Sequence, residues 1–199
     1  MLRLQSGNAS RLPGALLICT LLLAGGCSRL LVAVDSDPIE DPPGKRTMAQ
    51  RVADETIELK ALVNIHAADE RFKDSHVVAV SYNGYVLLAG QVTKEELKDK
   101  ASNVVRDIRH VRRIYNELEV AAPTASLVRT SDTWITAKIK SNLLAGNDTP
   151  GLRTKVVTEN GVVYLMGMVT REEADRLATA AADFSGVQRV VRLFEIINA

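Results

Sequence analysis

The sequence has little of what catalytic and metal-binding proteins need. Its 199 residues include two cysteines and three histidines, and the histidines do not stand at the spacing of a zinc motif. The GxGxxG, GxxxxGK and GxSxG patterns of nucleotide-binding proteins and hydrolases do not occur. An enzyme needs a poised set of reactive groups, and none stands out. We therefore expect no enzymatic activity, no cofactor and no metal site.

An excess of charge of either sign is also missing. The chain has 25 basic and 24 acidic residues, and its formal net charge is +1. Two of the basic residues, Arg3 and Arg11, lie in the first 26 residues, which contain no acid. A protein that binds nucleic acid without sequence preference shows a basic stripe, so we expect no nucleic-acid partner.

The N-terminus carries an apolar run, LPGALLICTLLLAGG, which follows these arginines and ends at Cys27. This pattern predicts a secretory signal over residues 1–26. The ending LLAGGC resembles the bacterial lipobox, which implies that Cys27 is lipidated and becomes the mature N-terminus. Because Ser28 stands where an inner-membrane protein usually has Asp, the resemblance implies a lipid-anchored protein on the periplasmic face of the outer membrane.

Two other readings of the N-terminus remain open. An uncleaved membrane helix could continue through residues 30–34, but Arg29 would then lie inside the bilayer at a considerable cost. A soluble secreted form is the third possibility. Once residues 1–26 are removed, Cys27 is the remaining cysteine, so no disulfide can form within the mature chain.

The sequence contains an internal repeat. NGYVLLAGQVTKEE, at residues 83–96, returns 77 positions later as NGVVYLMGMVTREE, at residues 160–173. Asn-Gly between apolar runs predicts a type I′ hairpin turn, and Thr followed three residues later by Glu predicts a capping box at the start of a helix. The glycine inside each strand indicates a bulge or a close helix contact. The structural positions are Asn83, Gly84, Gly90, Asn160, Gly161 and Gly167.

Each copy extends into a larger unit. Helical patterns cover residues 54–65 and 132–144, and alternating strands cover residues 111–120 and 187–196. The sequence thus predicts an α+β fold of two tandem αββαβ domains, at residues 48–121 and 131–199. A lipidated N-terminus and flexible linker precede them at residues 27–47, and a second linker covers residues 122–130. The nearly continuous apolar strands predict a second covered face, which either the other repeat or a partner could cover, and the short linker favours contact between the repeats.

These features resemble BON domains. The likeness covers most of residues 50–199 and is carried by the repeated NG-(x)5-G-x-V-T-(K/R)-E-E signature and by SDTWITAKIKSNLL, at residues 131–144. The layout resembles that of dual BON-domain outer-membrane lipoproteins. This resemblance implies a three-stranded mixed sheet packed by two helices in each domain, no enzymatic activity, binding to anionic phospholipid and support of the outer-membrane barrier.

Trp134 is the single tryptophan and has no aromatic counterpart in the first repeat, where Thr56 aligns with it. A helical wheel places it beside the apolar stripe, near Lys138 and Ser141. Tryptophan next to lysine suits a membrane interface, and Lys140 makes the helix more basic. The alternative is that Trp134 is a core residue. The aligned helix of the first repeat carries Asp54, Glu55 and Glu58, so we expect anionic lipid to avoid it.

Two hypotheses of function follow, and an envelope enzyme is a distant third. The first is a non-enzymatic outer-membrane lipoprotein that binds an anionic phospholipid membrane through Trp134, Lys138, Ser141 and Lys140 of the second domain. The second is an adaptor for outer-membrane assembly or cell-wall remodelling proteins, with lipid contact incidental.

Overall fold

A computed structural model describes residues 44–146 and 149–198. The predicted signal, Cys27 and most of the tether lie outside these residues. The first repeat contains α3 (Met48–Ala68), the 3-10 helix η1 (Glu70–Asp74), β1 (His76–Tyr82), β2 (Tyr85–Val92), α4 (Glu95–Arg106) and β3 (Arg113–Val120). The second contains α5 (Ser126–Ala145), η2 (Gly151–Arg153), β4 (Thr154–Glu159), β5 (Val162–Val169), α6 (Arg171–Ala182) and β6 (Arg189–Ile196).

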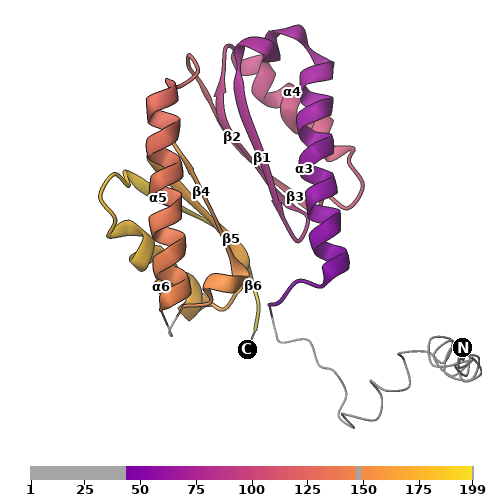
Figure 1. The fold of residues 1–199 in the computed structure, drawn as a ribbon. Helices are drawn as coiled ribbons and strands as arrows, with labels where there is room; N and C mark the ends of the chain where they lie inside the picture. The colour runs from indigo at the N-terminus through magenta and orange to yellow at the C-terminus, as the bar shows by residue number, and fades with distance from the viewer. Residues whose placement is uncertain (1–43, 147–148, 199) are drawn as a thin grey trace, which may run out of the picture. The chain divides into compact units, whose positions relative to one another are not determined.

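Each repeat forms one three-stranded mixed sheet. The strand orders are β1-β2-β3 and β4-β5-β6. The first pair of each sheet is an antiparallel hairpin, whereas the third strand returns through a helix and pairs parallel to the middle strand. In the first repeat α3 and α4 lie on the same face of the sheet (Figure 1). The predicted α+β fold with two helices on each sheet is confirmed.

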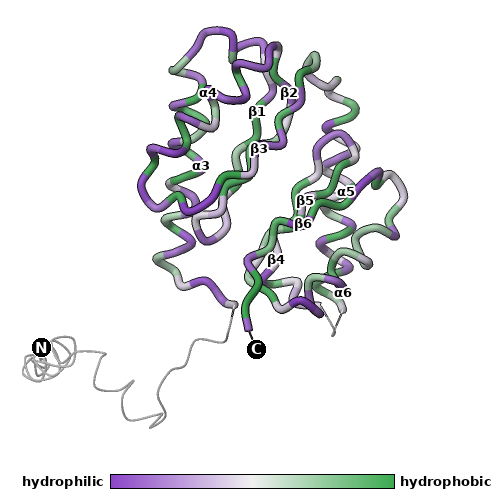
Figure 2. Tube along the Cα trace, turned by 180° about the vertical axis from the view of Figure 1, so that it is seen from behind, coloured by the Kyte–Doolittle hydropathy of each residue, from purple (hydrophilic) through white to green (hydrophobic). Residues whose placement is uncertain are grey.

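The middle strands are buried on both faces. In β2, Val86 and Leu88 belong to the core beneath α3 and α4, whereas Leu87 and Ala89 belong to a cluster shared with the other repeat. The strand β5 alternates in the same way, and hydrophobic residues cover much of it (Figure 2). This double burial explains the nearly continuous apolar runs of the sequence.

The shared cluster joins the two sheets through their helix-free faces. Its buried members are Val80, Tyr82, Leu87, Ala89, Val162, Tyr164, Met166 and Leu193. Fully burying one such apolar side chain contributes roughly 1.5–3 kcal/mol to stability. Burial in this cluster raises the pKa of Tyr164 to about 12. The predicted contact between the repeats is confirmed.

The opening helices are longer than the sequence pattern predicted. The helix α5 begins at Ser126, so residues 126–130 of the predicted linker 122–130 are helical. After Pro123 the chain has no helix breaker, and the hydroxyl of Thr130 donates to the carbonyl oxygen of Ser126. Among the described residues, no helix has both the length and the apolar character needed to cross a bilayer.

The two Asn-Gly turns have the predicted geometry. The φ angles are 52° and 75° at Asn83 and Gly84, and 48° and 74° at Asn160 and Gly161, so both central residues of each hairpin are left-handed. Gly90 and its counterpart in β5, Gly167, lie where neighbouring backbone comes close. An added side chain would meet the carbonyl oxygen of His76, at the start of β1, and that of Arg153, at the end of η2. At Gly90 the close neighbour is therefore a strand rather than the predicted helix.

The capping boxes differ between the repeats. Thr170 accepts from the backbone N–H of Glu173, whose side chain accepts in return from the N–H of Thr170, as predicted. The prediction for Thr93 is wrong, because α4 is capped at Lys94 without a side-chain hydrogen bond. The carboxylate of Glu96, which would complete that box, instead accepts a hydrogen bond from Arg71.

Candidate functional site

A buried aspartate fixes how α5 lies on its sheet. Asp132 is 4% exposed, and its carboxylate accepts hydrogen bonds from the backbone N–H groups of Asn160 and Gly161 at 2.8 and 2.9 Å. The helix is thereby attached to the hairpin turn at one end, while Ile135, Ile139 and Leu143 bury its apolar stripe. The opposite side of α5 is left to solvent.

The first repeat has the same attachment. Asp54 accepts from the N–H groups of Asn83 and Gly84, and also from the hydroxyl of Ser81 and the guanidinium of Arg46. Burial alone would raise the pKa of Asp54, but these hydrogen bonds outweigh it and the pKa lies below its ordinary value. Sequence reasoning missed this role. The available signal was an aspartate at the aligned position of both opening helices.

Trp134 lies on the solvent side of α5. Its side chain is 64% exposed, and the ammonium nitrogen of Lys138 lies 5.4 Å from the centre of its ring. The alternative that Trp134 is a core residue is therefore wrong. Ser141 is also exposed and lies one turn beyond Lys138. The structure brings these three side chains to one face of the helix.

Lys140 is not part of that face. It follows Trp134 by six residues, which at 3.6 residues per turn places it roughly 120° around the helix. There it lines an open pocket beside η2. Of the four residues predicted to contact lipid, the structure therefore groups three and places the fourth elsewhere.

The prediction that α3 presents an acidic surface is wrong. Asp54 is buried, and Glu58 is half-buried, where it accepts from Lys155 Nζ at 2.5 Å and from the N–H of Ser81. Glu55 alone of the three acids is exposed. The outer face of α3 instead carries exposed apolar side chains, at Met48, Val52, Leu59 and Val63.

Polar contacts border the apolar cluster between the repeats. Glu195 accepts from Asn83 Nδ2 at 2.7 Å and from the guanidinium of Arg112 at 2.8 and 2.9 Å. Burial acts to raise the pKa of Glu195, but these hydrogen bonds outweigh it and lower the pKa. Between β1 and β4, which belong to different sheets, His76 Nε2 lies 3.3 Å from the carboxylate of Glu159. These contacts add specificity to an otherwise apolar interface.

The histidines do not converge. His66 contacts the carbonyl oxygen of Leu62, His76 contacts Glu159, and His110 is exposed. Within residues 44–146 and 149–198 no group of three or more His, Cys, Asp or Glu side chains could hold a metal ion.

Comparison with known proteins agrees with this architecture. The family model described as "BON domain" matches residues 53–122 and 131–198, which are the two αββαβ units. The chain therefore belongs to the BON-domain family, as the sequence signature indicated.

Three relatives share most of their length with it. The chain is 34% identical to the outer membrane lipoprotein DolP of Haemophilus influenzae, over 92% of this chain and 95% of that protein. It is 31% identical to a 21 kDa hemolysin of Actinobacillus pleuropneumoniae, with coverage of 79% and 81%. It is 28% identical to the osmotically-inducible protein Y of Escherichia coli, with coverage of 68% and 67%.

Proposed function

We propose that this BON-domain protein is a non-enzymatic outer-membrane lipoprotein that binds anionic phospholipid through α5 and supports the integrity of that membrane. The observation that carries the proposal is the exposed Trp134 beside Lys138, on a helix whose apolar stripe is already buried. An exposed tryptophan next to an ammonium group has no role in the core. It fits the boundary between lipid headgroups and acyl chains.

The interaction combines two forces. The indole ring contributes apolar area and a polar N–H, both of which suit the headgroup level. Each lysine near an anionic membrane surface adds about 1 kcal/mol, a contribution that salt screens. Lys138 acts next to the ring, Ser141 can donate to a phosphate oxygen, and Lys140 adds positive potential from the neighbouring face of the helix.

The location rests on the relatives and on the N-terminal sequence. The likeness to an outer membrane lipoprotein extends over 92% of the chain, and LLAGGC supplies a cysteine for lipidation. Acyl chains on Cys27 would hold the protein at the periplasmic face, because several chains together bind far more firmly than one. The contact through α5 then orients an already tethered domain.

An adaptor function is the second candidate, and one observation favours it. Met48, Val52, Leu59 and Val63 are each more than half exposed and recur on one face of α3. A face of this kind suits a protein partner, such as outer-membrane assembly or cell-wall remodelling factors. In that case the lipid contact of α5 would be incidental.

Vesicle flotation with residues 28–199, which lack the anchor, separates the two candidates. We expect the wild-type chain to float with anionic vesicles and less so as salt rises. Trp134→Glu should stay in the soluble fraction with an unchanged circular dichroism spectrum. Thr56→Glu changes the aligned exposed position of α3 and serves as the matched control, which should still float.

Two results would contradict the proposal. A folded Trp134→Glu chain that still floats places the lipid contact elsewhere. A wild-type chain that remains soluble whatever the vesicle charge favours the adaptor.

A further inference from the structure

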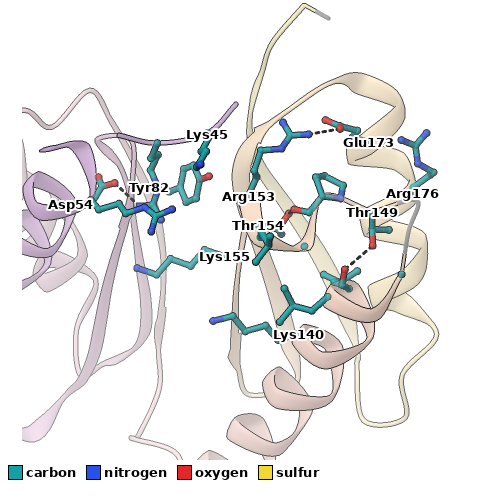
Figure 3. Close-up of a pocket in the computed structure, with 18 of the residues that line it drawn as sticks. Lys45, Asp54, Tyr82, Lys140, Thr149, Arg153, Thr154, Lys155, Glu173 and Arg176 are labelled. Carbon is teal, nitrogen blue, oxygen red and sulfur yellow. Dashed lines mark hydrogen bonds and ion pairs between the residues drawn. The ribbon is translucent and has the colours of Figure 1, made fainter. Parts of the chain in front are cut away.

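We propose that the open pocket beside η2 is a binding site for a ligand that carries two or more phosphate groups. This site goes beyond the lipid contact of Trp134, because it lies on a different face of α5 and draws on other parts of the chain. Its walls come from the segment before α3, the start of α3 and the end of β1 in the first repeat, and from the end of α5, η2 with the start of β4, and α6 in the second (Figure 3).

The pocket is large. Its volume is about 1300 Å³, above the roughly 300–1,000 Å³ of most small-molecule sites. One phosphate ion would fill little of it, so a ligand that contacts both walls must be larger. Figure 3 shows Lys140 and Lys155 extending from the second repeat toward the side that carries Asp54 and Tyr82.

Positive charge is concentrated here. Seven cationic side chains and three acidic ones line the pocket, although the formal charge of the whole chain is only +1. The cations are Lys45, Arg46, Arg51, Lys140, Arg153, Lys155 and Arg176, and the acids are Asp54, Glu55 and Glu173. Such a cluster within a concave wall focuses the potential and attracts anions.

Part of this charge builds the walls. Arg46 donates to Asp54 at 2.7 Å and stacks on Tyr82, with the guanidinium carbon 3.7 Å from the ring centre. Arg153 donates to Glu173 at 2.5 Å. These pairs hold their side chains in place, so a ligand meets guanidinium groups that are already ordered.

Three further cations of the pocket are available to a ligand. Within the described chain, the side chains of Lys45, Arg51 and Lys140 form no hydrogen bond or ion pair, and Glu55 is the lining carboxylate without a partner. The unpaired cations belong to both repeats. An anion with charged groups at two positions can therefore contact each side, which a single phosphate cannot.

Phosphate suits these donors better than carboxylate does. Guanidinium groups bind phosphate oxygens in pairs, and ammonium groups add point charges around them. The rim also carries exposed apolar side chains, with Leu144 at 50% and Leu152 at 89% exposure. The same phosphate chemistry could thus come from a lipid headgroup, whose chains would lie along this rim, or from a free polyphosphate compound.

Calorimetric titration of the full chain in nonionic detergent, at low ionic strength, tests the site with sodium pyrophosphate. We expect pyrophosphate to bind more tightly than orthophosphate, and Lys45→Gln/Arg51→Gln to weaken the binding at least tenfold. Neither side chain holds another described residue, so the variant should fold. Lys60→Gln/Arg109→Gln removes the same charges outside the pocket and is the matched control, which should bind as the wild type does.

Two outcomes overturn the proposal: no pyrophosphate binding by the wild-type chain, or an equal loss in both double variants. Trp134→Glu should bind pyrophosphate normally, so failure of the lipid-binding function remains distinguishable from failure of this site. Micelles of the same detergent doped with diphosphatidylglycerol identify the source. Displacement of pyrophosphate from Trp134→Glu by these micelles assigns the site to a lipid headgroup, and no displacement assigns it to a free phosphate compound.

Discussion

Asp132 and Gly161 are 29 residues apart in the sequence and are joined by a 2.9 Å hydrogen bond from the backbone N–H of the glycine to the aspartate Oδ1. The bond connects the helix that carries Trp134 to the tip of the hairpin beneath it. Asp54 and Gly84 are joined in the same way in the first repeat. This attachment sets which face of each opening helix points to solvent.

Replacing Asp132 with Asn should destabilise the protein. The amide has one acceptor oxygen and no charge, so at least one of the two turn N–H groups loses its partner. Charge-assisted hydrogen bonds of this kind are worth about 1.5–3 kcal/mol each, and we expect a loss within that range in urea unfolding. Asp99→Asn changes an exposed aspartate of α4 and should leave stability unaltered. Equal midpoints for both variants would contradict this role of Asp132.

Valine in place of the turn glycines should destabilise the fold by an amount on the order of 1 kcal/mol or more, because both glycines have positive φ. The cost should be larger at Gly84, where a new side chain would meet the carbonyl oxygen of His110, than at Gly161, where it meets the movable side chain of Gln188. Gly161→Asn should cost less than Gly161→Val, since asparagine adopts this conformation more readily. A Gly161→Val protein with an unchanged melting temperature would disprove the argument.

Glu159 should make stability depend on pH. Burial raises its pKa, although His76 and Arg129 act against the shift and Asp132 adds to it. Because the pKa is higher in the folded chain than in the unfolded one, the folded state binds more protons between the two values. The stabilisation that Glu159 provides is therefore complete at pH values below its pKa in the unfolded chain. It is lost as the pH rises through its pKa in the folded chain.

Glu159→Gln removes this titration. The free energy of unfolding of the wild-type protein minus that of the variant should be larger near pH 4 than near pH 7. Unfolding experiments at a series of pH values measure this difference. A stability difference that is flat across this range would show that the folded environment of Glu159 does not shift its pKa.

Cys27→Ala should release the protein from the membrane fraction, because the proposed acyl chains could no longer be attached. Fractionation of cells that express the variant measures this directly. Retention of the variant with residues 1–26 still attached would instead support the uncleaved membrane helix.

Local signals carried much of the prediction, and long-range contacts account for what it missed. An Asn-Gly turn is specified by two adjacent residues, so the pattern sufficed for both hairpins. The capping box at Thr93 failed because Arg71, distant in sequence, binds the glutamate that would complete it. Asp54 was expected on the surface, because nothing in its own helix could pair with a buried carboxylate. The N–H groups that make its burial possible come from the hairpin turn, about 30 residues further along the chain.

In the candidate site, too, the sequence predicted what depends on local spacing and missed what depends on distant segments. The helical wheel placed Trp134, Lys138 and Ser141 together, because spacing along one helix decides their positions. Lys140 belongs to a pocket whose other walls come from the segment before α3 and from η2. No periodicity within α5 could indicate those distant segments.

The cluster that joins the two sheets also bears on whether the halves of this duplicated chain are separable modules. Each sheet has helices on one face, and the apolar side chains of its other face are buried against the sheet of the other repeat. Only residues 121–125 separate β3 from α5, so the sister sheet is always present at high effective concentration. If the two repeats were expressed separately, each would therefore expose the apolar face of its sheet and tend to aggregate. For the same reason, thermal unfolding of the intact chain should be one cooperative transition.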